Sequence, residues 1–172
     1  MGEKGAATRA RILEASRVEF AEFGFAGARV DRIAERAQAD KAQLYSHFGN
    51  KDPLFDAVLH DSFEAIVDAV SVDLTDLPGY AVRLHDHDLE EPWVIRLATW
   101  ARLERRPSGL VVPSLSPPQV FTAVIALSMT WSPASTTFAA AADDPPAEHD
   151  RRRGVLRTLV ARAFGTTSPS RP

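Results

Sequence analysis

The placement of proline constrains the fold of this 172-residue chain more than any other feature. Of its 12 prolines, only Pro53 precedes residue 77. Proline cannot donate the backbone hydrogen bond that a helix interior or a central strand needs. The first part of the chain can therefore form long helices, while the remainder is divided into shorter segments. No strand-like alternation of apolar and polar residues persists between turn residues, so the sequence predicts an all-α protein.

Apolar residues in the first 50 positions recur at helical spacing. They predict an amphipathic helix that ends at Gly24, a second helix over residues 30–37 and a third over residues 41–48. Gln38 to Asp40 leave room for a tight turn, and Asp40 is the expected N-cap of the third helix.

A fourth helix is predicted to follow, with Asn50 as its N-cap and Pro53 in its first turn, where a missing N–H costs little. From Leu54 to Val70 the apolar residues keep to one face for about five turns, roughly 30 Å. This length exceeds what a three-helix unit needs, so we expect the fourth helix to continue into a C-terminal helical bundle.

Prolines mark the expected helices of the second part. Pro92 opens one helix and Pro107 closes it; a second lies between Ser116 and Pro133, and a last one follows Pro145 and Pro146 and ends at Phe164. Residues 166–172 are expected to form a disordered tail.

Composition excludes several classes of function. Zero cysteines remove disulfides, thiolate zinc sites and cysteine nucleophiles. No apolar run approaches the roughly 20 residues of a membrane-spanning helix, and the N-terminus has no secretory pattern, so we expect a cytoplasmic protein with no membrane partner. The net charge is −3, and residues 1–60 contain nine basic and nine acidic residues. A DNA-binding function must therefore be argued from the residue pattern.

Two short helices joined by about three residues, behind a packing helix, have the dimensions of a helix-turn-helix, although many three-helix bundles do too. The residues are more specific. Segments 30–37 (VDRIAERA) and 40–48 (DKAQLYSHF), with Asn50 and Lys51, closely resemble the DNA-binding signature of the TetR family of bacterial regulators. The resemblance covers about residues 6–66.

This resemblance implies a DNA-binding domain at residues 6–66, with the helix-turn-helix motif at about 29–48. It also implies an effector-binding and dimerisation domain at 67–165. The implied function is that of a transcriptional regulator, expected to be a repressor, with no enzymatic activity, no cofactor and no resident metal.

The third helix is the expected recognition helix. Its first turn contains Lys41, Ala42 and Gln43, and this end meets base edges when such a helix lies in the major groove. The Gln43 amide can bond adenine N6 and N7 together, whereas Lys41 can reach guanine or a phosphate.

Four further residues are expected to contact the DNA backbone. The resemblance implies that Tyr45 and His47 bind phosphate. Lys51 at the start of the fourth helix can clamp a phosphate with the local backbone N–H groups, and Arg29 at the start of the second helix can do the same on the opposite groove wall.

Two positions depart from the usual family pattern. Gln38 stands where glycine is common, and a left-handed backbone at a non-glycine residue costs about 1–2 kcal/mol. Asp40 stands where serine or threonine is more usual; it keeps the cap but places a negative charge near DNA.

Dimerisation follows from the symmetry of DNA, because two recognition helices must lie about 34 Å apart to meet successive major-groove turns. The expected interface consists of the helices at 117–131 and 147–164, since the resemblance places dimerisation on the last two helices. A small-molecule effector is expected to pack against Phe63, Trp93, Leu97 and Trp100; for the two tryptophans, core packing alone is the alternative.

Two rival functions rest on other features. His85 to Glu91 contains two imidazoles and several carboxylates that could ligate a divalent metal in a metal-dependent enzyme, although an exposed acidic loop between helices is the expectation. A DNA-binding structural protein without an effector is the second rival. The run Arg151 to Arg153 is expected to be a solvated helix start, and Arg32 and Arg36 a solvated helix face.

Overall fold

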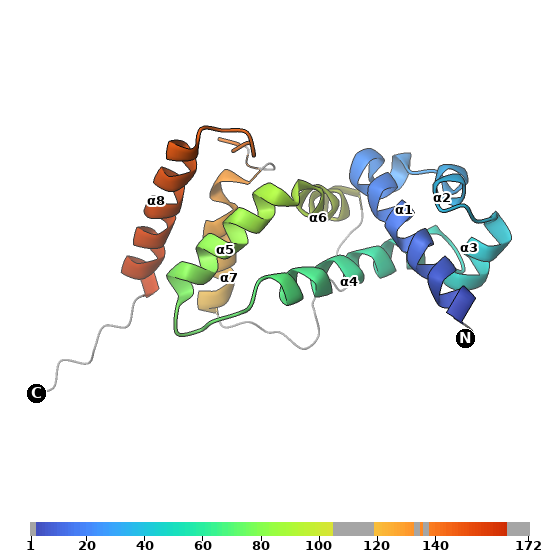
Figure 1. Cartoon of the computed structure of the whole chain (residues 1–172), viewed down its shortest axis with the longest axis horizontal. Coiled ribbons are helices and arrows are strands. Elements are labelled where there is room, and N and C mark those ends of the chain that lie inside the picture. Colours follow the sequence, from blue (N-terminus) through green and yellow to red (C-terminus); the bar gives the residue numbers. More distant parts are fainter. Residues whose placement is uncertain (1–2, 105–118, 133–134, 136–137, 165–172) are drawn as a thin grey trace, which may run out of the picture. The chain divides into compact units, whose positions relative to one another are not determined.

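A computed structural model describes residues 3–104, 119–132, 135 and 138–164, and every regular element among them is helical (Figure 1). The elements are α1 (Glu3–Gly27), α2 (Val30–Arg36), α3 (Lys41–Phe48), α4 (Lys51–Ala69), α5 (Leu77–Glu90), α6 (Pro92–Glu104), α7 (Gln119–Ser128), the 3-10 turn η1 (Met129–Trp131) and α8 (Pro146–Phe164). The all-α prediction is confirmed.

Contacts divide the chain into two compact units. The first contains residues 1–66 and 93–108, and the second contains residues 67–92 and 109–172. Helix α6 thus packs with the N-terminal helices, although it lies beyond α5 in the sequence.

The core of the first unit is built around aromatic rings. The Phe20 and Phe55 rings meet edge to face with centroids 4.9 Å apart, and Phe25 meets Phe55 in the same way at 5.3 Å. Such pairs stabilise a core beyond the area that they bury. Fully buried aliphatic side chains from the four N-terminal helices surround these rings: Ile12, Ile33, Leu44 and Leu54.

Gly24 interrupts α1, where the sequence predicted the end of a helix. Its φ of 69° and ψ of −179° are not helical, and one further turn follows to Gly27. A Cβ at Gly24 would lie 2.9 Å from ring atoms of Trp100. Glycine is therefore required here both by the backbone conformation and by the close approach of α6.

A buried carboxylate holds the connection between α1 and α2. Glu19 is fully buried, and its Oε1 accepts hydrogen bonds from the Arg29 backbone N–H (2.8 Å) and from Arg32 Nε (2.7 Å). Arg32 also lies over the Phe23 ring, with 4.2 Å from Cζ to the centroid. The Arg32 side chain, predicted to be solvated, is 37% exposed, and it also bonds this buried carboxylate.

In the second unit, α5 packs against α7, η1 and α8. The prediction of an exposed loop at residues 85–91 was wrong, because residues 77–90 form a helix. Its N-cap is Asp76, whose Oδ1 accepts from Gly79 N at 2.9 Å, and Pro78 lies in the first turn. His85 and Asp88 are 0% and 5% exposed.

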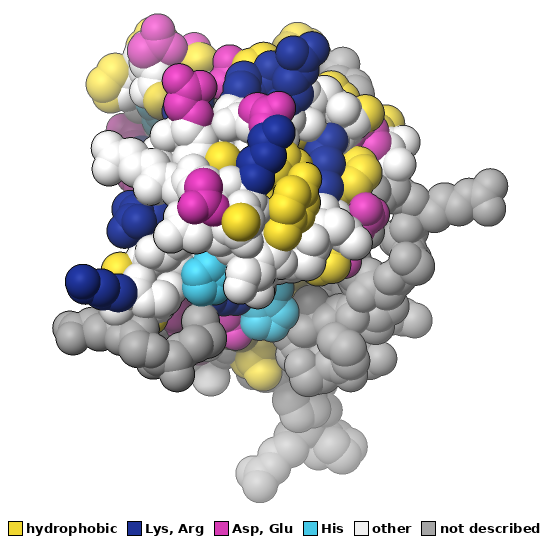
Figure 2. Space-filling model, turned by 90° about the vertical axis from the view of Figure 1, so that its right-hand side faces the viewer, with side chains coloured by type: hydrophobic (Ala, Val, Ile, Leu, Met, Phe, Trp, Pro, Cys, Tyr) yellow, Lys and Arg dark blue, Asp and Glu magenta, His cyan; other side chains and the backbone are white. Residues whose placement is uncertain are grey.

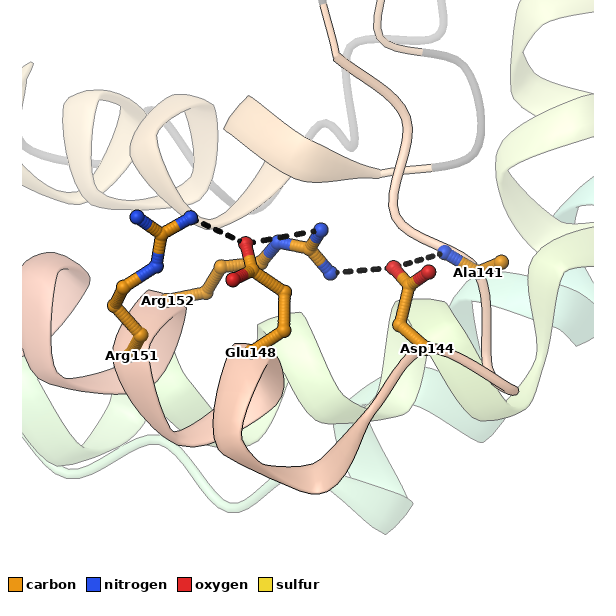
Figure 3. Close-up of polar contacts among 5 residues, drawn as sticks. All are labelled: Ala141, Asp144, Glu148, Arg151 and Arg152. Carbon is orange, nitrogen blue, oxygen red and sulfur yellow. Dashed lines mark hydrogen bonds and ion pairs between the residues drawn. The ribbon is translucent and has the colours of Figure 1, made fainter.

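A polar cluster fixes the start of α8 (Figure 3). Asp144 Oδ2 accepts from the Ala141 backbone N at 3.0 Å and from Arg152 Nη1 at 2.6 Å. Glu148 Oε1 pairs with Arg151 Nη2 at 2.7 Å and with Arg152 Nη2 at 3.3 Å. Arg151 is exposed as predicted, but the Arg152 side chain is only 14% exposed, so part of the arginine run is structural.

Some sequence expectations lie outside the described residues. These are the helix stops at Pro107 and Pro133, the opening at Ser116 to Pro118, and the tail at 166–172. Among the helices that the structure describes, none combines the length and hydropathy of a membrane span.

Candidate nucleic-acid interface

The turn between α2 and α3 contains a non-glycine residue with a left-handed backbone. Gln38 has a φ of 50°, the left-handed conformation in which glycine is common. The end of α2 is held by Arg11, whose Nε donates to the Ala37 carbonyl at 3.1 Å. The turn therefore keeps its shape without glycine, and contacts elsewhere in the unit offset its conformational cost.

A capping box orders the first turn of α3. Asp40 Oδ1 accepts from Gln43 N at 2.7 Å, and Gln43 Oε1 accepts from Asp40 N at 3.0 Å. This confirms Asp40 as the N-cap, and its carboxylate is engaged by the helix terminus. The second bond fixes the direction of the Gln43 amide, whose oxygen keeps a second lone pair for a base donor.

Helix α3 turns one face to solvent and one to the core. Leu44 and Phe48 are buried, which is the apolar stripe that the sequence predicted. Lys41, Ala42 and Gln43 are exposed, and the Tyr45 side chain is exposed to 46%. His47 is half-buried beside Phe48, with ring centroids 6.2 Å apart.

An ion pair joins the two helices of the motif. Lys41 Nζ on α3 pairs with Asp31 Oδ1 on α2, and both side chains are more than half exposed. A phosphate or base that binds Lys41 must share this ammonium with Asp31 or displace it. The sequence pattern did not reveal this competition.

Lys51 and Arg29 both lie beside the connection between α1 and α2. The Lys51 ammonium lies 4.9 Å from the centroid of the Phe25 ring and 3.5 Å from the Ala26 carbonyl. Arg29 is the N-cap residue of α2, with an exposed side chain and a backbone N–H held by Glu19. The structure thus brings these two predicted phosphate contacts to one segment.

Two residues that shape this surface were missed by the sequence reasoning. Glu19 positions Arg29, and no sequence signal distinguished it from the exposed charges of α1. Arg9 stacks on Phe48 with 5.2 Å from Cζ to the centroid, which adds an exposed cation beside the end of α3. Its only sequence signal was its place on the polar face of α1.

Charge on this end of the molecule is mixed. Figure 2 shows Lys and Arg side chains next to Asp and Glu side chains, with apolar atoms between them. This agrees with the equal numbers of basic and acidic residues in the first 60 positions. A DNA surface here depends on local clusters of cations and not on one continuous basic field.

The four residues predicted for an effector site all lie in the first unit. Leu97 is 1% exposed within its core, and Phe63 and Trp93 pack against that core. The Arg17 guanidinium lies over the Trp93 ring at 4.1 Å, and Trp100 covers Gly24. These contacts give the side chains a packing role on α1, and their role toward an effector stays a prediction.

The His85–Glu91 segment does not have the geometry that a metal site at positions i and i+2 needs. Residues two apart on a helix point about 200° apart; His85 is buried and His87 half-buried. Within the described part of the chain, no three His, Asp or Glu side chains gather in a way that could hold a metal ion.

Two family models match separate parts of the chain. Residues 12–58 match the model described as bacterial regulatory proteins, tetR family. Residues 76–110 match the model described as a tetracyclin repressor-like C-terminal domain.

Individual relatives agree with these matches. The HTH-type transcriptional repressor SCO4008 of Streptomyces coelicolor is 44% identical over 98 residues, which are 57% of this chain and 51% of the relative. The HTH-type transcriptional repressor AcnR of Corynebacterium efficiens is 36% identical over 70 residues, 41% of this chain and 37% of the relative. The matches thus span about half the length of these curated relatives or less.

The fold is similar to the solved structure of the candidate transcriptional regulator SCO4942 from Streptomyces coelicolor. The match covers 91% of this chain and 97% of the SCO4942 chain. Its TM-score is 0.70 at 32% sequence identity. The chain belongs to the TetR family. This is a family of transcriptional regulators and not of enzymes, so the metal-dependent enzyme loses its support.

Proposed function

We propose that this chain is a transcriptional repressor that binds an inverted-repeat operator as a homodimer and releases it when a small-molecule effector binds its C-terminal domain. The observation that carries the proposal is the exposed first turn of α3, ordered by the Asp40–Gln43 capping box inside the segment that matches the family model. Such a protein would act in the cytoplasm, on the nucleoid.

The proposed DNA contacts divide by chemistry. Gln43 and Lys41, with Ala42 between them, would meet base edges, and Tyr45, His47, Lys51 and Arg29 would contact phosphates. The exposed side chains of Lys41, Gln43, Tyr45 and Arg29 support this assignment. The relatives named as repressors support the direction of regulation.

Exposed apolar side chains on the last two helices support the proposed dimer. In α8 only Leu156 and Val160 are buried, whereas Val155 and Leu159, one turn apart, are 43% and 46% exposed. Val120 at the start of α7 is 41% exposed. A second copy of the same helices would cover these residues, as a self-complementary twofold interface requires.

Operator binding is tested by selection from a random duplex library with the full chain. We expect enriched sequences with two inverted half-sites whose centres lie about one helical turn apart. Enrichment of single half-sites, or no enrichment over bulk DNA, would contradict the proposal. Sequence-independent binding would favour a DNA-binding structural protein.

The dimer is tested by Leu159→Glu, with Leu103→Glu as the matched control, because Leu103 is 72% exposed on α6 and lies outside the proposed interface. Sedimentation should show a monomer only for Leu159→Glu, and this variant should lose operator affinity. If Leu159→Glu stays dimeric, α8 is not the interface.

A further inference from the structure

Two polar groups lie on the buried side of α5. His85 and Asp88 are three residues apart, so their side chains are neighbours on one face of the helix. They are 0% and 5% exposed. Buried polar groups without partners cost stability, and their presence in a core therefore needs an explanation.

The tautomer of His85 follows from its one hydrogen bond. Nδ1 lies 3.3 Å from the Ser128 carbonyl oxygen, which can only accept, so Nδ1 carries the proton and donates. In the neutral ring Nε2 is then an acceptor. Burial lowers the pKa of His85, and the charges of Arg152 and Arg153 add to the lowering. The ring is therefore neutral at pH 7, and among the described residues its buried Nε2 has no hydrogen-bond partner.

No ion pair joins the Asp88 carboxylate to a residue that the structure describes, and burial is the one cause that raises its pKa. The two arginines whose charges act on neighbouring His85 have other partners. Arg152 is held by Asp144 and Glu148 (Figure 3). Arg153 pairs with Asp86 at 2.8 Å and with Asp150 at 3.1 Å.

Aromatic side chains lie beside both groups. The Trp131 ring meets the His85 ring edge to face at 6.0 Å, and Tyr80 stacks on Phe121 at 5.4 Å. Burial raises the pKa of the Tyr80 phenol, and the charge of Asp88 adds to that rise, so the phenol lies within electrostatic reach of the carboxylate. These rings place apolar surface beside the two polar groups.

We propose that His85 and Asp88 form the polar end of the effector site and that the effector is an apolar organic cation with at least two N–H donors, such as a protonated amine or amidine. One N–H would bond the carboxylate of Asp88, and a second would bond Nε2 of His85. This inference rests on the proposed function, because it gives the effector of that repressor a chemical class. A metal ion fits less well, since within the described part of the chain no three His, Asp or Glu side chains gather to hold one.

Burial raises the pKa of Asp88 to about 7, which makes the proposed contact dependent on pH. Besides Tyr80, the charged groups that act on this face are Arg83 and Asp86 of α5 and Arg152 and Arg153 of α8. Residues 119–131 contain no ionisable side chain. A cation binds the ionised carboxylate, whose population rises from about one-tenth at pH 6 to about nine-tenths at pH 8.

The test uses the full chain and three probes of one shape: benzylammonium, which carries N–H donors; benzyltrimethylammonium, a cation without them; and neutral benzyl alcohol. Calorimetry should show that benzylammonium binds most tightly, about tenfold more tightly at pH 8 than at pH 6. Asp88→Asn should remove this pH dependence, while Glu90→Gln, an exposed carboxylate of the same helix, should keep it.

A second measurement uses the unmodified chain, so it does not depend on whether a variant folds. In protein labelled with ¹⁵N-histidine, benzylammonium should shift the His85 Nε2 resonance, and the free protein should show the Nδ1–H tautomer. An unshifted resonance would overturn the proposal. Equal binding of benzyl alcohol, or Zn²⁺ binding that requires both residues without amine binding, would overturn it as well.

Operator binding in the same preparations separates this inference from the proposed function. Benzylammonium should weaken operator binding in the unmodified chain and not in Asp88→Asn. Normal operator binding without amine binding refutes only the effector class. Absence of operator binding at any amine concentration refutes the proposed function itself.

Discussion

Gln43 has two roles in the structure, and they predict separable effects of substitution. Its Oε1 accepts from Asp40 N at 3.0 Å and completes the capping box of α3. Its exposed amide is the proposed base contact. Gln43→Ala removes both functions, whereas Gln43→Glu keeps a side-chain oxygen for the cap, since glutamate is common at this position of a capping box.

The magnitudes follow from these contacts. Loss of one exposed capping hydrogen bond costs about 0.5–1 kcal/mol, which corresponds to a fall in Tm of roughly 1–4 °C for a chain of this size. Loss of the base contact costs about 1–3 kcal/mol on the cognate operator, or roughly 5- to 150-fold in Kd. Binding to a scrambled duplex should change little, because phosphate contacts remain.

The assays are thermal unfolding by circular dichroism and fluorescence anisotropy on cognate and scrambled duplexes at several salt concentrations. We expect Gln43→Ala to lose stability and specificity, and Gln43→Glu to lose specificity with nearly unchanged stability. Equal weakening of both duplexes by Gln43→Ala would refute the seating of α3 in the major groove. Wild-type specificity in Gln43→Glu would refute the use of the amide donors.

Three further substitutions test other contacts. Lys51→Ala should weaken binding to all duplexes alike and lower the slope of log K against log salt concentration by about one unit per subunit. Lys51→Arg should keep the slope of the unmodified chain. An unchanged slope in titrations of Lys51→Ala would exclude the phosphate contact. Gly24→Ala should destabilise the fold by about 1–3 kcal/mol because of the positive φ and the 2.9 Å approach to Trp100. Gly5→Ala, the control, should not, since Gly5 has open space around it. Urea titrations compare the free energies of unfolding of the two variants. Because the folded pKa of Asp88 is raised to about 7, the folded state holds a proton that the unfolded state releases above about pH 4, so stability falls as pH rises to 7. Asp88→Asn should remove roughly 3 kcal/mol of this dependence between pH 5 and pH 8, and parallel pH profiles of the two proteins would exclude it.

The sequence predicted the DNA-binding unit well because its signals are local. The cap at Asp40 and the apolar spacing of Leu44 and Phe48 can each be recognised from residues within a few positions. The partners of Glu19 lie 10 and 13 residues away, and periodicity contains no information about such contacts.

The C-terminal helices were predicted less well, because their sequence signals are weaker. Helix α5 contains His85, Asp86, His87 and Asp88 in succession. This polar run interrupts the apolar spacing by which a helix is recognised in a sequence. Its buried face is apolar except where His85 and Asp88 lie. A helix with polar groups on its core side departs from the pattern that sequence analysis uses, and such departures are expected where a protein binds a ligand.

The same side chains that would contact DNA are already held by the protein, which bears on affinity and specificity. Gln43 is held by the Asp40 backbone, Lys51 by Phe25 and Ala26, and the Arg29 backbone by Glu19. Contacts of this kind lower the entropy lost on binding. Lys41 differs, because its partner Asp31 is an exposed acid and operator DNA must compete with it. Such a surface pair contributes little to stability. Its main effect would be on DNA binding, because the Lys41 ammonium must leave or share the Asp31 carboxylate before it can contact a base or a phosphate.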